Sequence, residues 1–228
     1  MLEGSKRKED MRAEQELATF LDKYFYRRLK ESTTDLHCIR HNEELAQKAG
    51  IDVAIHSSDS PTMYVDEKVS IYYRNGMIPT FAFEVNSIQR KLGKRIPGWL
   101  VNDDLKTTHY LLVWANVKCD NKTLKMKEVK DITEDEFTIV EALLISKKKI
   151  TEYLDSKGYT TEKIIEKAND ILAKGTPKNT YVGQRNFHFC YSTHLAEKPI
   201  NVVIQRRKLL ELASRAYYIG QDGLARFK

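Results

Sequence analysis

The sequence contains little cysteine, proline or glycine, and no long apolar run. Its three cysteines, Cys38, Cys119 and Cys190, show no Cys-x-x-Cys spacing, which argues against a disulfide framework and against a cysteine zinc site. It has no stretch of about 18 apolar residues that could span a membrane, and its first ten residues lack the apolar segment of a signal peptide. A glycine-rich phosphate loop, internal repeats and low-complexity tracts are also missing. We therefore expect a soluble protein in the reducing cytoplasm, with no membrane partner.

The composition favours a folded domain with a modest basic excess. Of 228 residues, 41% are hydrophobic, which suits one domain with a proper core. Lys and Arg number 38 against 32 Asp and Glu, a net charge of +6 that is compatible with a nucleic-acid partner without indicating one strongly. Basic residues cluster at 89–95, 147–149 and 206–208. For the last two clusters we favour solvated helix faces.

Hydrophobic periodicity predicts an α/β fold with a mixed sheet. Buried apolar runs and turn signals predict strands from Ile51 and over 65–68, 79–86, 109–117, 123–129, 137–145 (or a helix there), 180–182, 187–191 and 200–204. Helical spacing predicts a helix over 11–30, and the cap residues at 32–35 predict a shorter helical segment that follows them and ends at Gly50. Helices are also predicted over 147–157 and 161–174, with Ser146 and Thr160 as their caps, and over 206–217. The strand at 109–117 is the most apolar, so we expect it to be the central strand that completes the sheet.

Two acids and a lysine stand on neighbouring predicted strands. Asp52 begins one strand, and Asp66 and Lys68 lie on the next, after a turn through 57–61. Successive side chains of a strand alternate faces, so Asp66 and Lys68 point the same way and Glu67 points to the other face. A hairpin that brings Asp52 beside Asp66 would gather two carboxylates and one ammonium. Carboxylate oxygens suit Mg²⁺ or Mn²⁺, which can neutralise charge on a reacting phosphate and activate water, and a lysine can orient or deprotonate that water.

These residues resemble the PD-(D/E)XK nuclease superfamily, in its Gly-Ile-Asp version. The resemblance rests on Gly50-Ile51-Asp52 and on Asp66-x-Lys68, with no proline before Asp52. It implies a restriction endonuclease-like mixed central sheet flanked by helices, with a small C-terminal extension of helices and strands. We accordingly expect a single domain over 1–228, with its core at about 35–117, its N-terminal helix at 11–30 and its extension at about 120–228. Asp52 and Asp66 would be catalytic metal ligands and Lys68 the catalytic lysine, and Glu43 or Glu44 could add a metal contact.

A third strand offers a further acid. Glu84 is the polar intrusion in the apolar run 79–86, and a buried carboxylate needs a partner. It could be a supplementary catalytic group and metal ligand beside Asp66, or it could pair with a cation for structure alone. A second register is open, in which Asp66 is the first acid and Glu84-x-Asn86 replaces the acid-x-lysine pair. We prefer the first register because it keeps a lysine.

Basic and hydroxyl side chains near this strand are candidate phosphate contacts. The cluster after the Glu84 strand is the best placed, and the loop before the strand at 109–117 adds further donors. The predicted nucleic-acid-binding residues are Arg90, Lys91, Lys94, Arg95, Lys106 and Thr107.

The favoured function is that of a metal-dependent endonuclease that acts on DNA in restriction, defence or repair. Double-stranded DNA is the expected substrate. A homodimer is possible, since enzymes of this type often cut both strands as dimers. One alternative is a nuclease-fold protein that binds nucleic acid or a protein partner without cutting. Another is that Asp66 and Lys68 are ordinary surface residues on an unrelated α/β fold.

Overall fold

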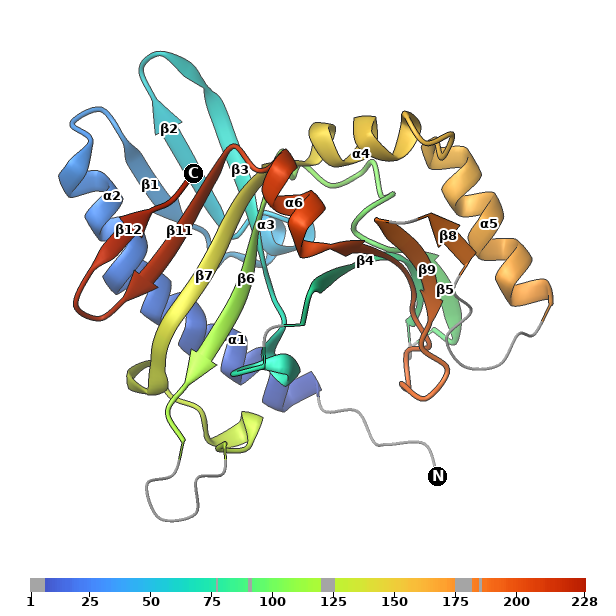
Figure 1. Cartoon of the computed structure of the whole chain (residues 1–228), viewed down its shortest axis with the longest axis horizontal. Coiled ribbons are helices and arrows are strands. Elements are labelled where there is room, and N and C mark those ends of the chain that lie inside the picture. Colours follow the sequence, from blue (N-terminus) through green and yellow to red (C-terminus); the bar gives the residue numbers. More distant parts are fainter. Residues whose placement is uncertain (1–6, 77, 90–91, 120–125, 175–181, 185) are drawn as a thin grey trace. The chain divides into compact units, whose positions relative to one another are not determined.

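The apolar runs of the chain form two separate sheets, each in its own compact unit (Figure 1). The computed structural model describes residues 7–76, 78–89, 92–119, 126–174, 182–184 and 186–228. The larger unit comprises 6–78, 106–146 and 213–228, and the smaller unit comprises 79–105 and 147–212. The chain therefore leaves the larger unit twice and returns to it twice.

The larger unit holds a seven-stranded mixed sheet. Its order is β1-β2-β3-β6-β7-β11-β12, in which β3 and β6 pair in parallel and all other neighbours are antiparallel. A parallel pair needs a crossover, and the first segment of the smaller unit lies within it. The strands are β1 (His37–Arg40), β2 (Val53–Ser57), β3 (Ser60–Val69), β6 (His109–Val117), β7 (Phe137–Ser146), β11 (Arg215–Gly220) and β12 (Leu224–Arg226).

One long helical segment supplies much of the larger unit's core. It consists of α1 (Arg7–Leu21), the π-helical turn η1 (Asp22–Tyr26) and α2 (Arg27–Ser32), drawn in blue in Figure 1. Phe20 is fully buried, and its ring lies 5.5 Å from that of Phe137 on β7. The shorter elements are α3 (Glu44–Lys48) and the 3₁₀ turns η2 (Ile71–Tyr73), η3 (Val129–Asp131) and η4 (Glu134–Glu136).

The smaller unit holds a five-stranded antiparallel sheet together with the helices α4, α5 and α6. The sheet order is β5-β4-β10-β9-β8, and buried Phe83, Phe187 and Phe189 contribute to its core. The strands are β4 (Thr80–Gln89), β5 (Lys94–Pro97), β8 (Val182–Gln184), β9 (Phe187–Tyr191) and β10 (Ile200–Gln205), and the helices are α4 (Lys147–Asp155), α5 (Thr161–Ala173) and α6 (Arg206–Leu212).

The α/β class with a mixed sheet flanked by helices is confirmed, as is the predicted cap of α5, where the Thr160 side chain accepts from the backbone N–H of Lys163. The region after residue 120, expected to be an extension, supplies β7, β11 and β12 to the larger sheet and α4, α5 and α6 to the smaller unit. The sheet that contains β2, β3 and β6 does not include the 79–86 strand, which forms β4 of the other sheet.

Several predicted secondary-structure elements were wrong. Where a strand formed instead of a helix or loop, its pairing with a neighbouring strand explains the difference. The helix expected over 206–217 ends at Leu212, and Arg215–Gly220 instead forms β11, paired antiparallel with β7. His37–Arg40, expected within the helical segment that follows the cap residues 32–35 and ends at Gly50, is β1. The residues Lys94–Pro97, expected in a loop, form β5. Of the strand predicted at 123–129, residues 123–125 lie outside the described chain, Met126 forms only an isolated bridge, and Val129 begins a 3₁₀ turn.

Candidate functional site

The β2–β3 hairpin brings Asp52 beside Asp66, as predicted. Val53 lies opposite Val65, and the backbone N–H of Asp52 donates to the Val65 carbonyl at 2.9 Å. The Asp52 carboxylate accepts from the backbone N–H of Glu67 at 2.7 Å and from Gln47 Nε2 at 3.3 Å. Both oxygens of Asp52 are therefore oriented by the fold.

Asp66 and Lys68 contact each other on one face of β3. Lys68 Nζ lies 2.5 Å from Asp66 Oδ1, and Asp66 is only 4% exposed. Burial raises the pKa of Asp66 to about 6; the nearby Asp52 carboxylate adds to the rise and the Lys68 ammonium opposes it. Burial lowers the pKa of Lys68, but the carboxylates of Asp66 and Asp52 outweigh it and leave that pKa above its ordinary value. In this state Lys68 is a charged donor rather than a base.

Glu67 points to the other face, where it anchors β3. Arg40 makes two hydrogen bonds to the Glu67 carboxylate, at 2.9 and 3.0 Å, and the Tyr26 hydroxyl donates to it at 2.7 Å. Arg40 Nε also donates to Asp22 at 2.7 Å. Because Asp22 and Tyr26 belong to η1, this network ties the acid-bearing strand to the N-terminal helical segment.

A small polar cleft of about 160 Å³ opens beside Asp52. Glu14 of α1 lines it, and the Glu14 charge contributes to the raised pKa of Lys68. Glu14 is a site residue that the sequence analysis missed, since the acid from a preceding helix was sought between 42 and 48, close to Asp52 in the chain. The other lining residues are Met11, Gln15, Leu17, Ala18, Arg40, Asn42, Gln47, Glu67 and Val69.

Glu43 and Glu44, the acids predicted to contact the metal from the short helix before β2, lie away from the cleft and pair with other side chains. Glu43 is exposed, and its carboxylate lies 3.3 Å from His41 Nδ1. Glu44 pairs with Lys48 at 2.6 Å on the outer face of α3. Neither residue lines the cleft. A metal contact from Glu43 or Glu44 remains a prediction without geometric support.

Glu84 lies on β4 in the smaller unit, whereas Asp52, Asp66 and Lys68 all belong to the larger unit. Its carboxylate accepts from the Ser87 hydroxyl at 3.1 Å, and Asn86 of the second register accepts from Arg95 at 2.5 Å. The first register therefore has its three residues within one unit. The catalytic and metal-binding role of Glu84 stays a prediction.

The predicted phosphate contacts divide into several groups. Arg90 and Lys91 lie outside the described residues. Lys94 and Arg95 lie on β5, and the Arg95 guanidinium is held by Asn86 and by the Lys198 carbonyl at 3.1 Å.

The two predicted contacts in the larger unit lie next to each other in the loop before β6. The backbone N–H of Lys106 donates to the Ala49 carbonyl at 2.8 Å. Thr107 is 5% exposed and its hydroxyl donates to the Gly50 carbonyl at 2.7 Å. The Thr107 side chain thus serves the fold at the turn before β2.

The acidic side chains of Asp52 and Asp66 suit a hard cation only in part. Within the described residues, no group of three or more His, Cys, Asp or Glu side chains is placed to hold a metal ion. Mg²⁺, however, commonly takes one or two protein carboxylates and fills its other positions with water and substrate phosphate oxygens. Asp52 lines the cleft and Asp66 does not, but the two carboxylates lie close enough for Asp52 to raise the pKa of Asp66, and as a pair they meet that requirement.

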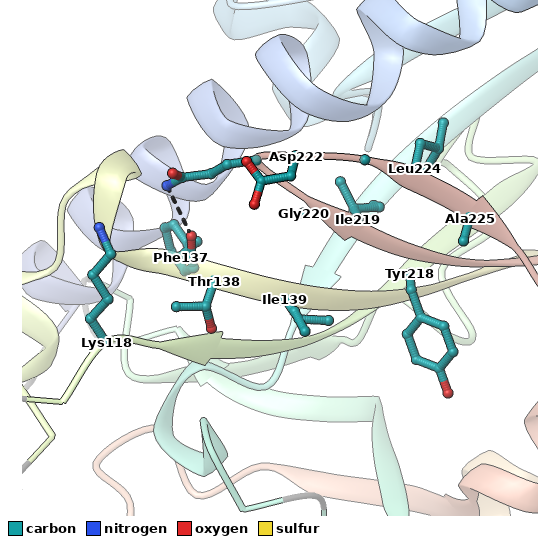
Figure 2. A pocket seen from close by; sticks show the side chains of 12 residues that line it. Lys118, Phe137, Thr138, Ile139, Tyr218, Ile219, Gly220, Asp222, Leu224 and Ala225 are labelled. Carbon is teal, nitrogen blue, oxygen red and sulfur yellow. Dashed lines mark hydrogen bonds between the residues drawn. The ribbon is translucent and has the colours of Figure 1, made fainter.

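A second hollow, on the sheet of the larger unit, lacks such chemistry. It has a volume of about 530 Å³ and is lined by β7, β11, β12 and their turns (Figure 2). Ile139 and Tyr218 are its exposed apolar side chains, and Lys118 and Asp222 are its charged ones. Since this hollow has only one carboxylate, the cleft at Asp52 is the better candidate site.

Comparisons with protein-family profiles, with curated proteins and with solved structures found no significant match. In the part of the chain that the structure describes, no helix is both long and apolar enough to cross a bilayer.

Proposed function

We propose that this chain is a metal-dependent nuclease with a restriction endonuclease-like fold, which hydrolyses DNA phosphodiester bonds. The observation that carries the proposal is the β2–β3 hairpin, which gathers Asp52, Asp66 and Lys68 at one place in one unit. The mixed sheet and the preceding helices are compatible with the fold that the resemblance implies.

The chemistry assigns a part to each residue. Asp52 and Asp66 would hold Mg²⁺ or Mn²⁺, which when bound would polarise a phosphate oxygen and lower the pKa of a water. Lys68, charged in this environment, would orient the attacking water or donate to a phosphate oxygen. The hydrogen bonds from Glu67 N–H and Gln47 keep the Asp52 carboxylate oriented, so little reorganisation is needed when the substrate arrives.

The test is a cleavage assay on supercoiled plasmid and on single-stranded DNA, with Mg²⁺ or Mn²⁺. Asp66→Asn and Lys68→Gln should each reduce the cleavage rate by roughly a hundredfold or more, because both remove a charge from the reacting centre. Calorimetric Mn²⁺ binding should also weaken in Asp66→Asn.

The matched control is Asp59→Asn, which removes an exposed acid from the turn of the same hairpin and should leave the rate unchanged. Equal cutting by the wild type, Asp66→Asn and Lys68→Gln would reject this site.

A nuclease-fold protein that binds nucleic acid without cutting is the second candidate. It is favoured by the absence of a three-ligand metal cluster among the described residues and by the direct contact between Lys68 and Asp66. DNA binding that persists with no cleavage under any divalent cation would support it.

A further inference from the structure

The positive charge of the chain is carried by the smaller unit. Residues 79–105 and 147–212 hold 17 Lys and Arg against 10 Asp and Glu, a net charge of +7. Residues 6–78, 106–146 and 213–228 hold 21 of each kind, and so the unit with the candidate catalytic residues is neutral. The single charge in residues 1–5, Glu3, accounts for the total of +6. The segments of the two units alternate along the chain, so this separation of charge between the units cannot be seen in the sequence alone.

Two basic triplets lie on helices that contact each other in this unit. Lys208 Nζ of α6 lies 5.4 Å from the ring centroid of Tyr153 on α4. We call the six residues that begin the two helices the α4–α6 basic surface: Lys147, Lys148, Lys149, Arg206, Arg207 and Lys208.

The outward members of this surface are weakly paired. The side chains of Lys148 and Arg207 are 82% and 87% exposed, and their nearest carboxylates, at the i+4 positions, lie 3.7 and 3.8 Å away. Exposed pairs of this kind contribute little, so these cations can exchange their partner for a phosphate at small cost. Lys149 is also exposed.

The apolar faces of α4 and α6 are buried in the core of the smaller unit. Ile150 and Leu154 of α4 and Leu209 of α6 are buried in the unit. Binding to a lipid surface by an amphipathic helix would require an apolar face to insert, and neither helix has one to spare. A polyanion that needs only charge, such as the backbone of DNA, fits this surface better.

We propose that the smaller unit, through the α4–α6 basic surface, binds the phosphate backbone of duplex DNA independently of sequence. The inference rests on the proposed function, since it assigns substrate capture to one unit and cleavage to the other. Phosphate contacts supply most non-specific affinity, and each contact makes the affinity depend on salt.

The experiment measures binding of a fluorescent 30-base-pair duplex by anisotropy, with full-length protein in EDTA so that no metal supports cleavage. The test variant combines Lys148→Gln, Lys149→Gln and Arg207→Gln. Its affinity at 100 mM salt should fall roughly tenfold or more. The slope of log affinity against log salt should become shallower by about one for each phosphate that the variant no longer neutralises.

The control variant combines Arg27→Gln, Lys48→Gln and Lys130→Gln in the neutral unit. It loses the same three charges from exposed side chains, so it keeps the net charge equal to that of the test variant. Its affinity and salt slope should stay near the wild-type values. An equal loss in both variants would overturn the proposal, because net charge alone would then explain binding.

Further arms separate the remaining outcomes. Lys148→Arg, Lys149→Arg and Arg207→Lys together should retain binding, and an unchanged circular dichroism spectrum and melting temperature should show that the test variant is folded.

A test variant that loses binding to phosphatidylserine vesicles but not to DNA would overturn the proposal. Unchanged DNA binding by the test variant together with normal cleavage would overturn this inference and leave the nuclease standing. Loss of binding in the test variant, alongside a wild type that never cuts, would support the inference and reject the nuclease.

Discussion

At the scale of single residues, the acid-bearing strand is held by a buried charge network. Arg40 and Glu67 have side chains that are only 14% and 10% exposed, and Asp22 and Tyr26 complete their hydrogen bonds. Removing one partner of such a pair leaves an uncompensated charge in a poorly solvated place, which costs more than the pair itself contributes. Breaking the network should therefore destabilise the larger unit more than the intact network stabilises it.

Arg40→Met should lower the free energy of unfolding by about 3 kcal/mol, at the lower end for buried pairs because some solvent reaches the site. Urea unfolding followed by circular dichroism measures this change. The double variant Arg40→Met with Glu67→Leu should recover part of the loss, since no isolated charge remains.

The control for this prediction is Arg27→Met, which breaks an exposed i,i+4 pair with Glu31 and should cost less than about 1 kcal/mol. Equal losses at Arg40 and Arg27 would show that the buried network does not stabilise the larger unit.

At the scale of elements, Gly98 allows the segment after β5 to lie close against β4. A Cβ on Gly98 would lie 2.3 Å from the Glu84 carbonyl oxygen, and the Gly98 N–H donates to the Val85 carbonyl at 2.7 Å. The next residue, Trp99, packs its ring 5.1 Å from that of Phe83. Trp99 therefore anchors this segment against the core of the smaller unit.

Gly98→Ala should destabilise the smaller unit by about 1–3 kcal/mol, because the clash is with backbone atoms that no side-chain rotation relieves. Thermal unfolding followed by Trp99 fluorescence in a Trp114→Phe background measures it. As a control in the larger unit, Gly76→Ala meets no atom within 4 Å and should leave the midpoint reported by Trp114, in a Trp99→Phe background, nearly unchanged. A tolerated Gly98→Ala would mean that β4 and the following segment can separate without cost.

At the scale of the whole molecule, the two units have separate reporters. The chain has two tryptophans; Trp99 belongs to the smaller unit and buried Trp114 to the larger. The hydrophobic core cluster that includes Phe20 and Phe137 lies entirely in the larger unit. Units with separate cores can unfold at different denaturant concentrations, and then no single stability describes the chain.

Phe20→Ala should cost the larger unit about 3–5 kcal/mol through loss of a fully buried ring. The unfolding midpoint reported by Trp114, in a Trp99→Phe background, should fall accordingly, and the midpoint reported by Trp99 should move much less. Leu45→Ala, at an 82% exposed position, should move neither. Identical shifts of both reporters would show that the two units unfold as one.

The sequence by itself determined the β2–β3 hairpin and the grouping of Asp52, Asp66 and Lys68. A period of two, a short turn and neighbouring strands are local properties, so they can be read without knowing the rest of the fold. The strands over 109–117 and 187–191 were also predicted with correct bounds, because their apolar runs are continuous.

Only the tertiary structure decided which distant segments share a unit. It placed Glu84 on another sheet, brought Glu14 of α1 to the candidate site, and made 215–220 a strand by pairing it with β7. It also collected the basic triplets at 147–149 and 206–208 in one unit. These outcomes depend on contacts between residues far apart in the chain, whose free energy comes from burial and pairing and leaves no periodic trace in the sequence.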